Sequence, residues 1–153
     1  MVGLRGDYRY LKRCRVRRQT KAALLDDLRT TSIQGVNSRI SLAVQDAKGS
    51  LRAGLSGTTS YGWLRVTMLW VSAYHRRSGV ASQLMHDAIK LSLERGCHAA
   101  WLETSNPQAR AFYEDLGFKV FAELANDAGA MPESHTRWFL RCNIMSSQHE
   151  ESP

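Results

Sequence analysis

The segment that most constrains the fold lies between residues 63 and 104, where two apolar runs flank a helical pattern. The first run, WLRVTMLWV at 63–71, is rich in β-branched and apolar residues and predicts a central strand covered on both faces. A polar loop leads into residues 80–95, where apolar side chains recur at helical spacing. The second run, HAAWLE at 98–103, predicts another buried strand. Because a helix connects the two strands, we expect them to be parallel, with a right-handed crossover.

A second helix is predicted directly after this unit. Asn106 and Pro107 are the residue types preferred at a helix N-cap and in its first turn, and Gly117 is a typical stop. Arg110 and Glu114 have the spacing of an ion pair on the helix surface. Four apolar residues are expected on its inner face: Ala109, Phe112, Tyr113 and Leu116.

The flanking segments predict further strands. Residues 39–45 alternate as a strand, and 46–49 predict a hairpin turn that leads into a returning strand at 51–57. The glycine- and threonine-rich stretch 54–62 predicts a flexible link. Two closing strands are predicted, over residues 118–124 and 136–144.

The N-terminal residues give weaker signals, with some strand character at 8–18 and a short helix at 21–29. The predicted fold class is mixed α/β, with a central mixed sheet of about six to seven strands flanked by helices. Its N-terminal part would be antiparallel and its central strand–helix–strand unit parallel. The length of 153 residues fits one domain, expected over residues 1–145 and followed by a polar, disordered tail at 146–153.

The basic residues are concentrated at the N-terminus. The formal net charge is +7, and residues 1–21 carry eight basic side chains against Asp7 alone. Such a block attracts phosphates, in nucleic acid or in a phosphorylated ligand. It is equally typical of a solvated edge strand or a frayed terminus, and both interpretations stay open. Nucleic acid is therefore a candidate partner, although not the favoured one.

The remaining composition narrows the setting. No apolar run approaches the roughly 20 residues that span a membrane, and arginines interrupt the N-terminus where a signal peptide would need an apolar core. We therefore expect a cytoplasmic protein with no membrane partner. The cysteines are three, with no CxxC pair, so neither a disulfide framework nor a metal site is expected: Cys14, Cys97 and Cys142.

The loop between the first predicted strand and its helix has the features of an anion site. The first turn of a helix has unpaired N–H groups and the positive end of the dipole. Small residues at Gly79 and Ala81 let a phosphate approach the backbone, and Arg76 and Arg77 add positive charge. The Gly-Lys-Ser/Thr ending of a P-loop and the three glycines of a dinucleotide fingerprint are both missing. Alone, the pattern is also typical of a plain tight turn.

The second helix adds a more specific pattern, Asn106-x-x-Ala109-x-x-Phe112-Tyr113-x-x-x-Gly117-Phe118. Combined with Arg76-x-x-Gly79-x-Ala81, it resembles the signature of the GNAT superfamily of N-acetyltransferases. The resemblance is clearest over residues 63–124 and extends in weaker form to 39–62 and 136–144. Stretches at 54–64, 69–71 and 113–121 are similar to a bacterial GNAT branch of unassigned substrate.

The resemblance implies how acetyl-CoA would bind as co-substrate. In this family the pyrophosphate rests on backbone N–H groups of the loop, and the pantetheine arm pairs with the central strand. The Asn position, here Asn106, contacts that arm or orders water beside it. The implied binding residues are Leu69, Val71, Arg76, Arg77, Gly79, Val80, Ala81, Asn106 and Tyr113.

The resemblance also implies direct attack by the amine, with Tyr113 protonating the leaving thiolate. Many family members carry an acidic base on the central strand, but residues 63–71 contain none. Glu103 is the first candidate for that base, followed by Glu123, His75 and a chain of waters. The simpler interpretations also stay open: Tyr113 as a core aromatic residue, Asn106 as a helix cap only, and the two arginines as solvated loop charges.

The leading hypothesis is acetylation of a primary amine on a small molecule. An acidic patch would favour cationic amines, and Asp26, Asp27, Glu103 and Glu123 are the residues that could contribute to one. The alternatives are acetylation of a macromolecule, either a protein amine or an aminoacyl-tRNA, and a non-catalytic acyl-CoA or nucleic-acid-binding module. A homodimer is a family-level expectation, with the last strand at 136–144 as the edge available for pairing.

Overall fold

The computed structural model describes residues 14–31 and 37–145, and the chain separates into two compact units, residues 1–34 and 35–153. The first unit contains one described helix, α1 (Cys14–Thr31). The second contains a mixed sheet with two longer helices and a short 3₁₀ turn. The expectation of one domain over residues 1–145 stays a prediction.

Helix α1 confirms the predicted short helix at 21–29 but begins earlier, so the strand character predicted for residues 14–18 is wrong. Arg, Lys, Gln, Ala and Leu dominate this helix, and such side chains lose little rotamer freedom there. Their combined preference outweighs the isolated Val16. The rest of the predicted strand, residues 8–13, and the tail at 146–153 lie outside the described residues.

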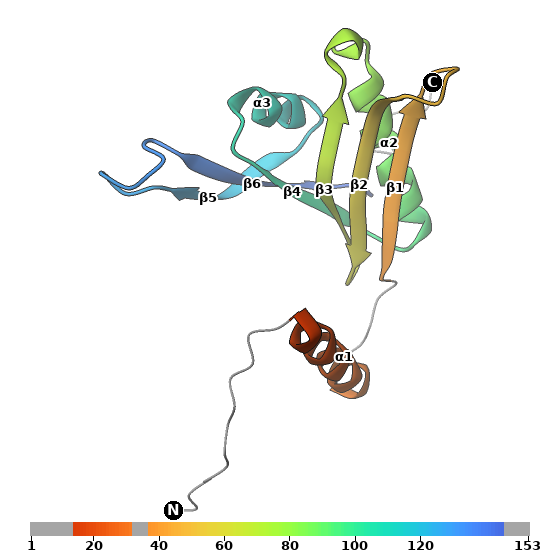
Figure 1. The fold of residues 1–153 in the computed structure, drawn as a ribbon, viewed down its shortest axis with the longest axis vertical. Helices are drawn as coiled ribbons and strands as arrows, with labels where there is room; N and C mark the ends of the chain where they lie inside the picture. The colour runs from red at the N-terminus through yellow and green to blue at the C-terminus, as the bar shows by residue number, and fades with distance from the viewer. Residues whose placement is uncertain (1–13, 32–36, 146–153) are drawn as a thin grey trace, which may run out of the picture. The chain divides into compact units, whose positions relative to one another are not determined.

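The second unit is built on a six-stranded sheet with the strand order β1-β2-β3-β4-β6-β5 (Figure 1). The pair β3–β4 is parallel, and the other four neighbouring pairs are antiparallel. This confirms the predicted mixed α/β class. The strands are β1 (Ser38–Gln45), β2 (Leu51–Ser60), β3 (Trp63–Val71), β4 (Ala99–Thr104), β5 (Lys119–Ala125) and β6 (Thr136–Asn143).

The predicted flexible link at 54–62 is wrong, because β2 continues through Ser60 before a short turn. Glycine serves close packing here. A Cβ atom on Gly57 would lie 2.7 Å from the carbonyl oxygen of Arg65 on β3. The hairpin predicted at 46–49 is confirmed, with Gly49 at φ 79° and its N–H donating to the Asp46 carbonyl at 2.9 Å.

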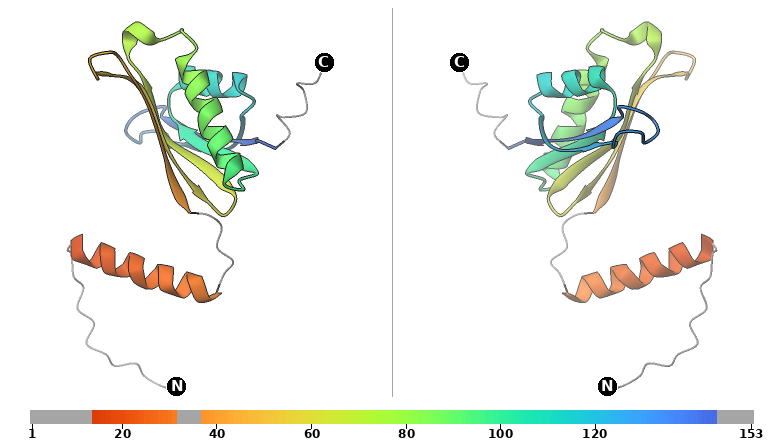
Figure 2. Two further views of the ribbon diagram at one scale, coloured as in Figure 1. Left: turned by 90° about the vertical axis from the view of Figure 1, so that its right-hand side faces the viewer. Right: turned by 90° about the vertical axis from the view of Figure 1, so that its left-hand side faces the viewer.

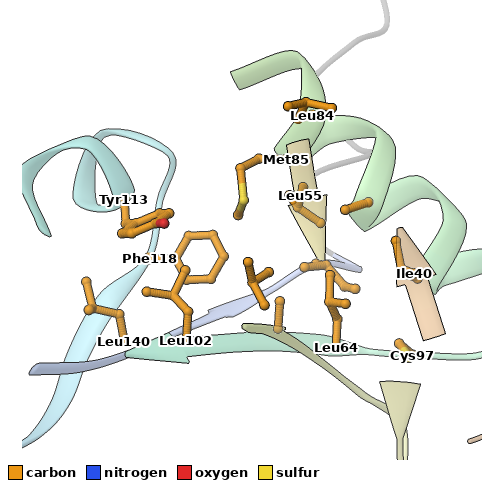
Figure 3. Packing of buried hydrophobic residues seen from close by; sticks show 14 of the residues in the cluster. Ile40, Leu55, Leu64, Leu84, Met85, Cys97, Leu102, Tyr113, Phe118 and Leu140 are labelled. Carbon is orange, nitrogen blue, oxygen red and sulfur yellow. The ribbon is translucent and has the colours of Figure 1, made fainter. Parts of the chain in front are cut away.

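Helices α2 (Val80–Glu94) and α3 (Pro107–Asp115) lie on the same side of the sheet (Figure 2). Their inward residues, Met85 of α2 and Tyr113 of α3, join the strands in one apolar core that also contains Phe118 (Figure 3). Among residues 14–31 and 37–145, the structure contains no helix that is both long enough and apolar enough to cross a membrane.

Within residues 37–145, no helix covers the other side of the sheet. On β3, Leu64 and Val66 are buried against α2, whereas Arg65 and Thr67 are exposed. The prediction that β3 is covered on both faces is therefore wrong for this unit, because its residues alternate between core and surface.

The last strand was expected to lie at an edge of the sheet, and this prediction is wrong. Strand β6 lies between β4 and β5, so the edge strands are β1 and β5. Leu140 on β6 is fully buried, whereas Phe121 and Leu124 on β5 are more than half exposed. An inner position buries β6 against strands on both sides, which a strand pattern alone does not reveal.

Strands β3 and β4 pair only over their first three residues, Trp63 to Arg65 with Ala99 to Trp101. The register of β3 against β2 then shifts, because Met68 pairs with Ser56 and Val66 pairs with Gly57. Thr67 is the extra residue of a β-bulge, and a bulge bends its strand. Beyond this point the two parallel strands diverge and leave a gap between them.

Gly57→Ala tests the close approach of β2 and β3. We expect the variant to lower the free energy of unfolding by about 1–3 kcal/mol, because the added methyl group would collide with rigid backbone. Gly54→Ala in the same strand is the matched control, since its Cβ would lie 3.4 Å from the nearest atom, the Leu42 carbonyl oxygen. Urea denaturation gives both values, and equal effects of the two substitutions would contradict the explanation.

Candidate functional site

The gap between β3 and β4 forms a pocket of about 430 Å³. Residues 66–70 of β3 line one side, residues 102–104 of β4 line the other, and α3 closes one end. The part of β3 beyond Arg65 has β2 as its neighbour on one side and the gap on the other. An extended chain can therefore pair with the open side of β3 as an added strand would.

A second pocket, of about 310 Å³, lies at the N-terminus of α2. Gly79 is the N-cap of the helix, with φ 80° and ψ −6°, a left-handed conformation that favours glycine. Because glycine has no side chain, it leaves the first N–H groups of α2 uncapped. A Cβ atom at this position would meet nothing within 4 Å, so the space in front of the helix is open. Uncapped N–H groups beside open space can bind an anion.

The loop before α2 is held by its own hydrogen bonds. The Ser72 hydroxyl lies 2.8 Å from His75 Nδ1, and the Ser78 hydroxyl donates to the His75 carbonyl at 2.6 Å. Arg76 donates through Nε to the Val71 carbonyl at 3.3 Å, which keeps its guanidinium beside the end of β3. Arg77 has φ 60°, so the loop turns sharply just before the helix.

Tyr113 lies on the helix side of the gap. Its ring packs edge-on against Phe112 and Phe118, and the close view shows it above Phe118 within the core (Figure 3). Burial raises the pKa of the Tyr113 phenol above its usual value near 10, because the tyrosinate anion loses hydration there. Tyr113 also lines the gap pocket, so this core aromatic residue has access to the space between the strands.

Asn106 is a helix cap, as its sequence position predicts. Its side-chain oxygen accepts from the Gln108 N–H at 2.8 Å and from the Ala109 N–H at 3.3 Å. Asn106 also lines the gap pocket, so capping leaves it at the edge of the site. The predicted ion pair on α3 is present too, with Arg110 Nε 2.9 Å from Glu114 Oε1.

Glu103 approaches the gap from the side opposite Tyr113. Its carboxylate accepts from Arg65 at 3.0 Å and from Arg137 at 3.5 Å. Arg65 in turn lies over the Trp101 ring at 4.6 Å, on the face of the sheet without a helix. Glu103 therefore carries out a structural task, because it ties β3, β4 and β6 together beside the pocket.

Glu123 and Glu103 do not form an acidic patch. Glu123 pairs with Trp138, and Trp138 pairs with Thr104, the residue after Glu103. Directly paired residues of neighbouring strands share a face, whereas consecutive residues lie on opposite faces. The two carboxylates are therefore separated by the sheet.

The structure distributes the sequence-predicted residues between the two pockets. The helix-end pocket is lined by Val71, Arg76, Arg77, Gly79, Val80 and Ala81. The gap pocket is lined by Leu69, Glu103, Asn106 and Tyr113. The pockets adjoin, because Leu69 and Val71 are two residues apart on β3, and because Phe112 and Tyr113 are consecutive on α3.

Some residues of the gap pocket were not predicted as functional, and Met68 and Trp70 of β3 are two of them. Arg65 and Arg137 do not line the pocket, but both pair with Glu103, which does. His75, a secondary candidate for the base, lines the helix-end pocket instead of the gap. The described part of the chain contains no cluster of three or more His, Cys, Asp or Glu residues that could hold a metal ion.

A larger hollow lies elsewhere. It measures about 740 Å³ and is lined by His98, Lys119 and Arg141, at the opposite end of β4 from the gap pocket. None of the sequence-predicted site residues lines it, and it has no helix N-terminus. Size alone therefore does not identify the site, whereas the two smaller pockets combine an anion site with an open strand.

A sequence profile of the Acetyltransferase (GNAT) family matches residues 15–118. The chain belongs to the GNAT family. An acetyltransferase of Agrobacterium fabrum is 34% identical over 85 residues, which are 56% of this chain and 62% of that protein. Blasticidin-S acetyltransferase of Streptomyces morookaense is 36% identical over 78 residues, 50% of this chain and 57% of that protein. The matches thus span about three fifths of each relative's length.

Solved structures share the GNAT fold. An acetyltransferase from Bacillus cereus superposes with a TM-score of 0.76 at 21% identity, covering 90% of this chain and 97% of that one. An aminoglycoside 6'-N-acetyltransferase complexed with coenzyme A gives a TM-score of 0.60 at 17% identity, covering 82% and 80%. At these identities the likeness establishes the fold alone.

Proposed function

We propose that this GNAT protein transfers an acetyl group from acetyl-CoA directly to a primary amine of a small molecule. The observation that carries the proposal is the adjacency of two features, the uncapped N-terminus of α2 and the open strand edge in the gap. The pyrophosphate and the amide-containing pantetheine arm of acetyl-CoA need two such sites beside each other. The similarity to Blasticidin-S acetyltransferase supports a small-molecule acceptor.

The residues present fit the co-substrate. The backbone N–H groups from Arg77 to Ala81 would bind the pyrophosphate, and Arg76 would add charge from its position beside Val71. Leu69 and Val71 would present backbone groups to the pantetheine arm along the open side of β3. Asn106 would contact the arm at the far side of the gap.

The two sides of the gap suit the two proton transfers. The amine nitrogen attacks the acetyl carbonyl carbon and loses a proton, and the carbon–sulfur bond then breaks. Glu103 would accept the amine's proton, directly or through water, on the side without helices. Tyr113 would donate its proton to the departing thiolate on the helix side. Solvent returns the proton from Glu103 to Tyr113, so a neutral amine and the thioester give an amide and a thiol with no net release of a proton.

The other expectations stay predictions. The basic block at 1–21, which motivates a macromolecular acceptor, lies mostly outside the residues whose side chains are described. Neither a nucleic-acid interaction, a homodimer nor a cytoplasmic location is tested by the fold. If a dimer forms through a sheet edge, the available strands are β1 and β5.

The cofactor site can be tested by thermal unfolding with acetyl-CoA and a Gly79→Glu variant. At about 100 times Kd, we expect the wild-type Tm to rise by about 5 °C or more, because binding stabilises the folded state. In the variant, the carboxylate would repel the pyrophosphate, and the shift should disappear. Gly129→Glu is the matched control, since Gly129 has a similar φ of 81° outside both pockets. Equal shifts in both variants would contradict the placement.

The role of Tyr113 can be tested with Tyr113→Phe. We expect kcat to fall by about 100-fold with little change in the Kd for acetyl-CoA, because only the proton donor is removed. Tyr74→Phe, at an exposed tyrosine, should behave as wild type. Because burial raises the pKa of Tyr113, the phenol stays protonated through neutral pH, and no loss of activity from its ionisation should occur below about pH 10. A fully active Tyr113→Phe enzyme would leave Tyr113 with a packing role only.

The role of Glu103 can be tested by the pH dependence of Glu103→Gln. If Glu103 is the base, kcat/KM should fall by about 10- to 100-fold at pH 7 and recover as rising pH deprotonates the free amine. A loss that is the same at every pH would instead indicate that only the ion pairs with Arg65 and Arg137 matter. Glu123→Gln is the control on the opposite face of the sheet.

A further inference from the structure

The gap pocket contains one carboxylate, and two arginines already bind it. Glu103 is the only carboxylate among the described residues that line the pocket, and Arg65 and Arg137 lie 3.0 Å and 3.5 Å from its oxygens. One negative and two positive charges leave this group with a net charge of +1. A polycationic amine would therefore meet a surplus of positive charge.

The two arginines differ in how strongly they are engaged. Arg65 makes the shorter ion pair and also lies over the Trp101 ring at 4.6 Å. Arg137 makes the longer ion pair, and half of its side chain is exposed. A guanidinium presents five donors, so Arg137 can keep Glu103 and still bind a second carboxylate.

An apolar wall, formed by Met68 and Trp70 of β3, lies across the gap from Glu103 of β4. Met68 and Trp70 line the pocket and are 65% and 48% exposed. Because Leu69 and Val71 pack against the core, Met68 and Trp70 point to the other face of the sheet, where Glu103 lies. Exposed apolar side chains beside a polar group are typical of a ligand site.

We propose that the acceptor is a zwitterionic α-amino acid with an apolar side chain. Arg137 binds the α-carboxylate, Glu103 faces the α-amine, and Met68 and Trp70 contact the side chain. The pair of opposite charges, Arg137 and Glu103, is complementary to the carboxylate and ammonium of the ligand. This inference rests on the proposed acetyltransferase function.

The test compares L-phenylalanine with L-phenylalaninamide as acceptors, using thiol release from acetyl-CoA. The amide keeps the shape and removes the negative charge. We expect kcat/KM to favour L-phenylalanine by about 10-fold or more, because a charge-assisted contact to Arg137 is lost with the amide. Spermidine and kanamycin, as polycations, should be poor acceptors. Equal rates for acid and amide, or a preference for the polycations, would overturn the proposal.

Variants of Arg137 test whether this side chain causes the preference for the acid over the amide. Arg137→Gln should reduce the ratio of kcat/KM for acid over amide to about one, whatever its effect on the absolute rates through Glu103. Arg137→Lys, which keeps the charge without the planar fork, should retain part of it. Arg141→Gln is the matched control on the same strand and face, because Arg141 lies over Phe121, whereas Arg137 pairs with Glu103. A preference that survives Arg137→Gln unchanged would overturn the assignment.

Calorimetric binding of the same two compounds to the CoA-bound protein separates the two proposals. Tighter binding of L-phenylalanine that depends on Arg137 supports the inference even without turnover, in which case the acetyltransferase proposal fails alone. Turnover of other amines, with no preference for the carboxylate in rate or in binding, refutes the inference and leaves the acetyltransferase proposal intact.

Discussion

The candidate site of the second unit depends on the divergence of β3 and β4. The strands share only three paired positions before the bulge at Thr67 bends β3 away. Parallel strands need a crossover, and α2 supplies it by running from the end of β3 back to the start of β4. Its N-terminus therefore lies at the open end of the gap. The uncapped N-terminus of α2 and the open edge of β3 adjoin because one topology produces both.

Sequence patterns correctly predicted local features, such as caps and turns, that depend on residues close together in the chain. The cap at Asn106 and the hairpin at 46–49 each follow from a few adjacent residues, and both are confirmed. Sequence patterns gave wrong predictions where the structure depends on contacts between segments that are far apart in the chain. The stretch 54–62 resembles a linker until β3 approaches it, and the place of β6 depends on its pairing with β4 and β5.

The same distinction applies to the candidate site, where only some of the residues could be predicted from the sequence. Tyr113 and the loop before α2 belong to contiguous motifs, so the sequence could suggest them. The ion pairs of Glu103 could not be suggested, because Arg65 and Arg137 are 38 and 34 residues away and meet it only through strand pairing. The exposed wall of Met68 and Trp70 was hidden for a related reason. The bulge at Thr67 changes which residues of β3 face the core.

The two faces of the gap impose different chemistry on the groups that line it. On the helix side, packing excludes water, and a buried carboxylate there would lose its hydration without an ionic partner. A phenol is suited to that side, because burial keeps it neutral and therefore able to donate a proton. On the other side, solvent and arginines stabilise charge, so Glu103 can remain beside the pocket. The side of the sheet that the helices cover thus determines that Tyr113, the proposed proton donor, is buried, and that Glu103, the proposed acceptor, lies on the side without helices.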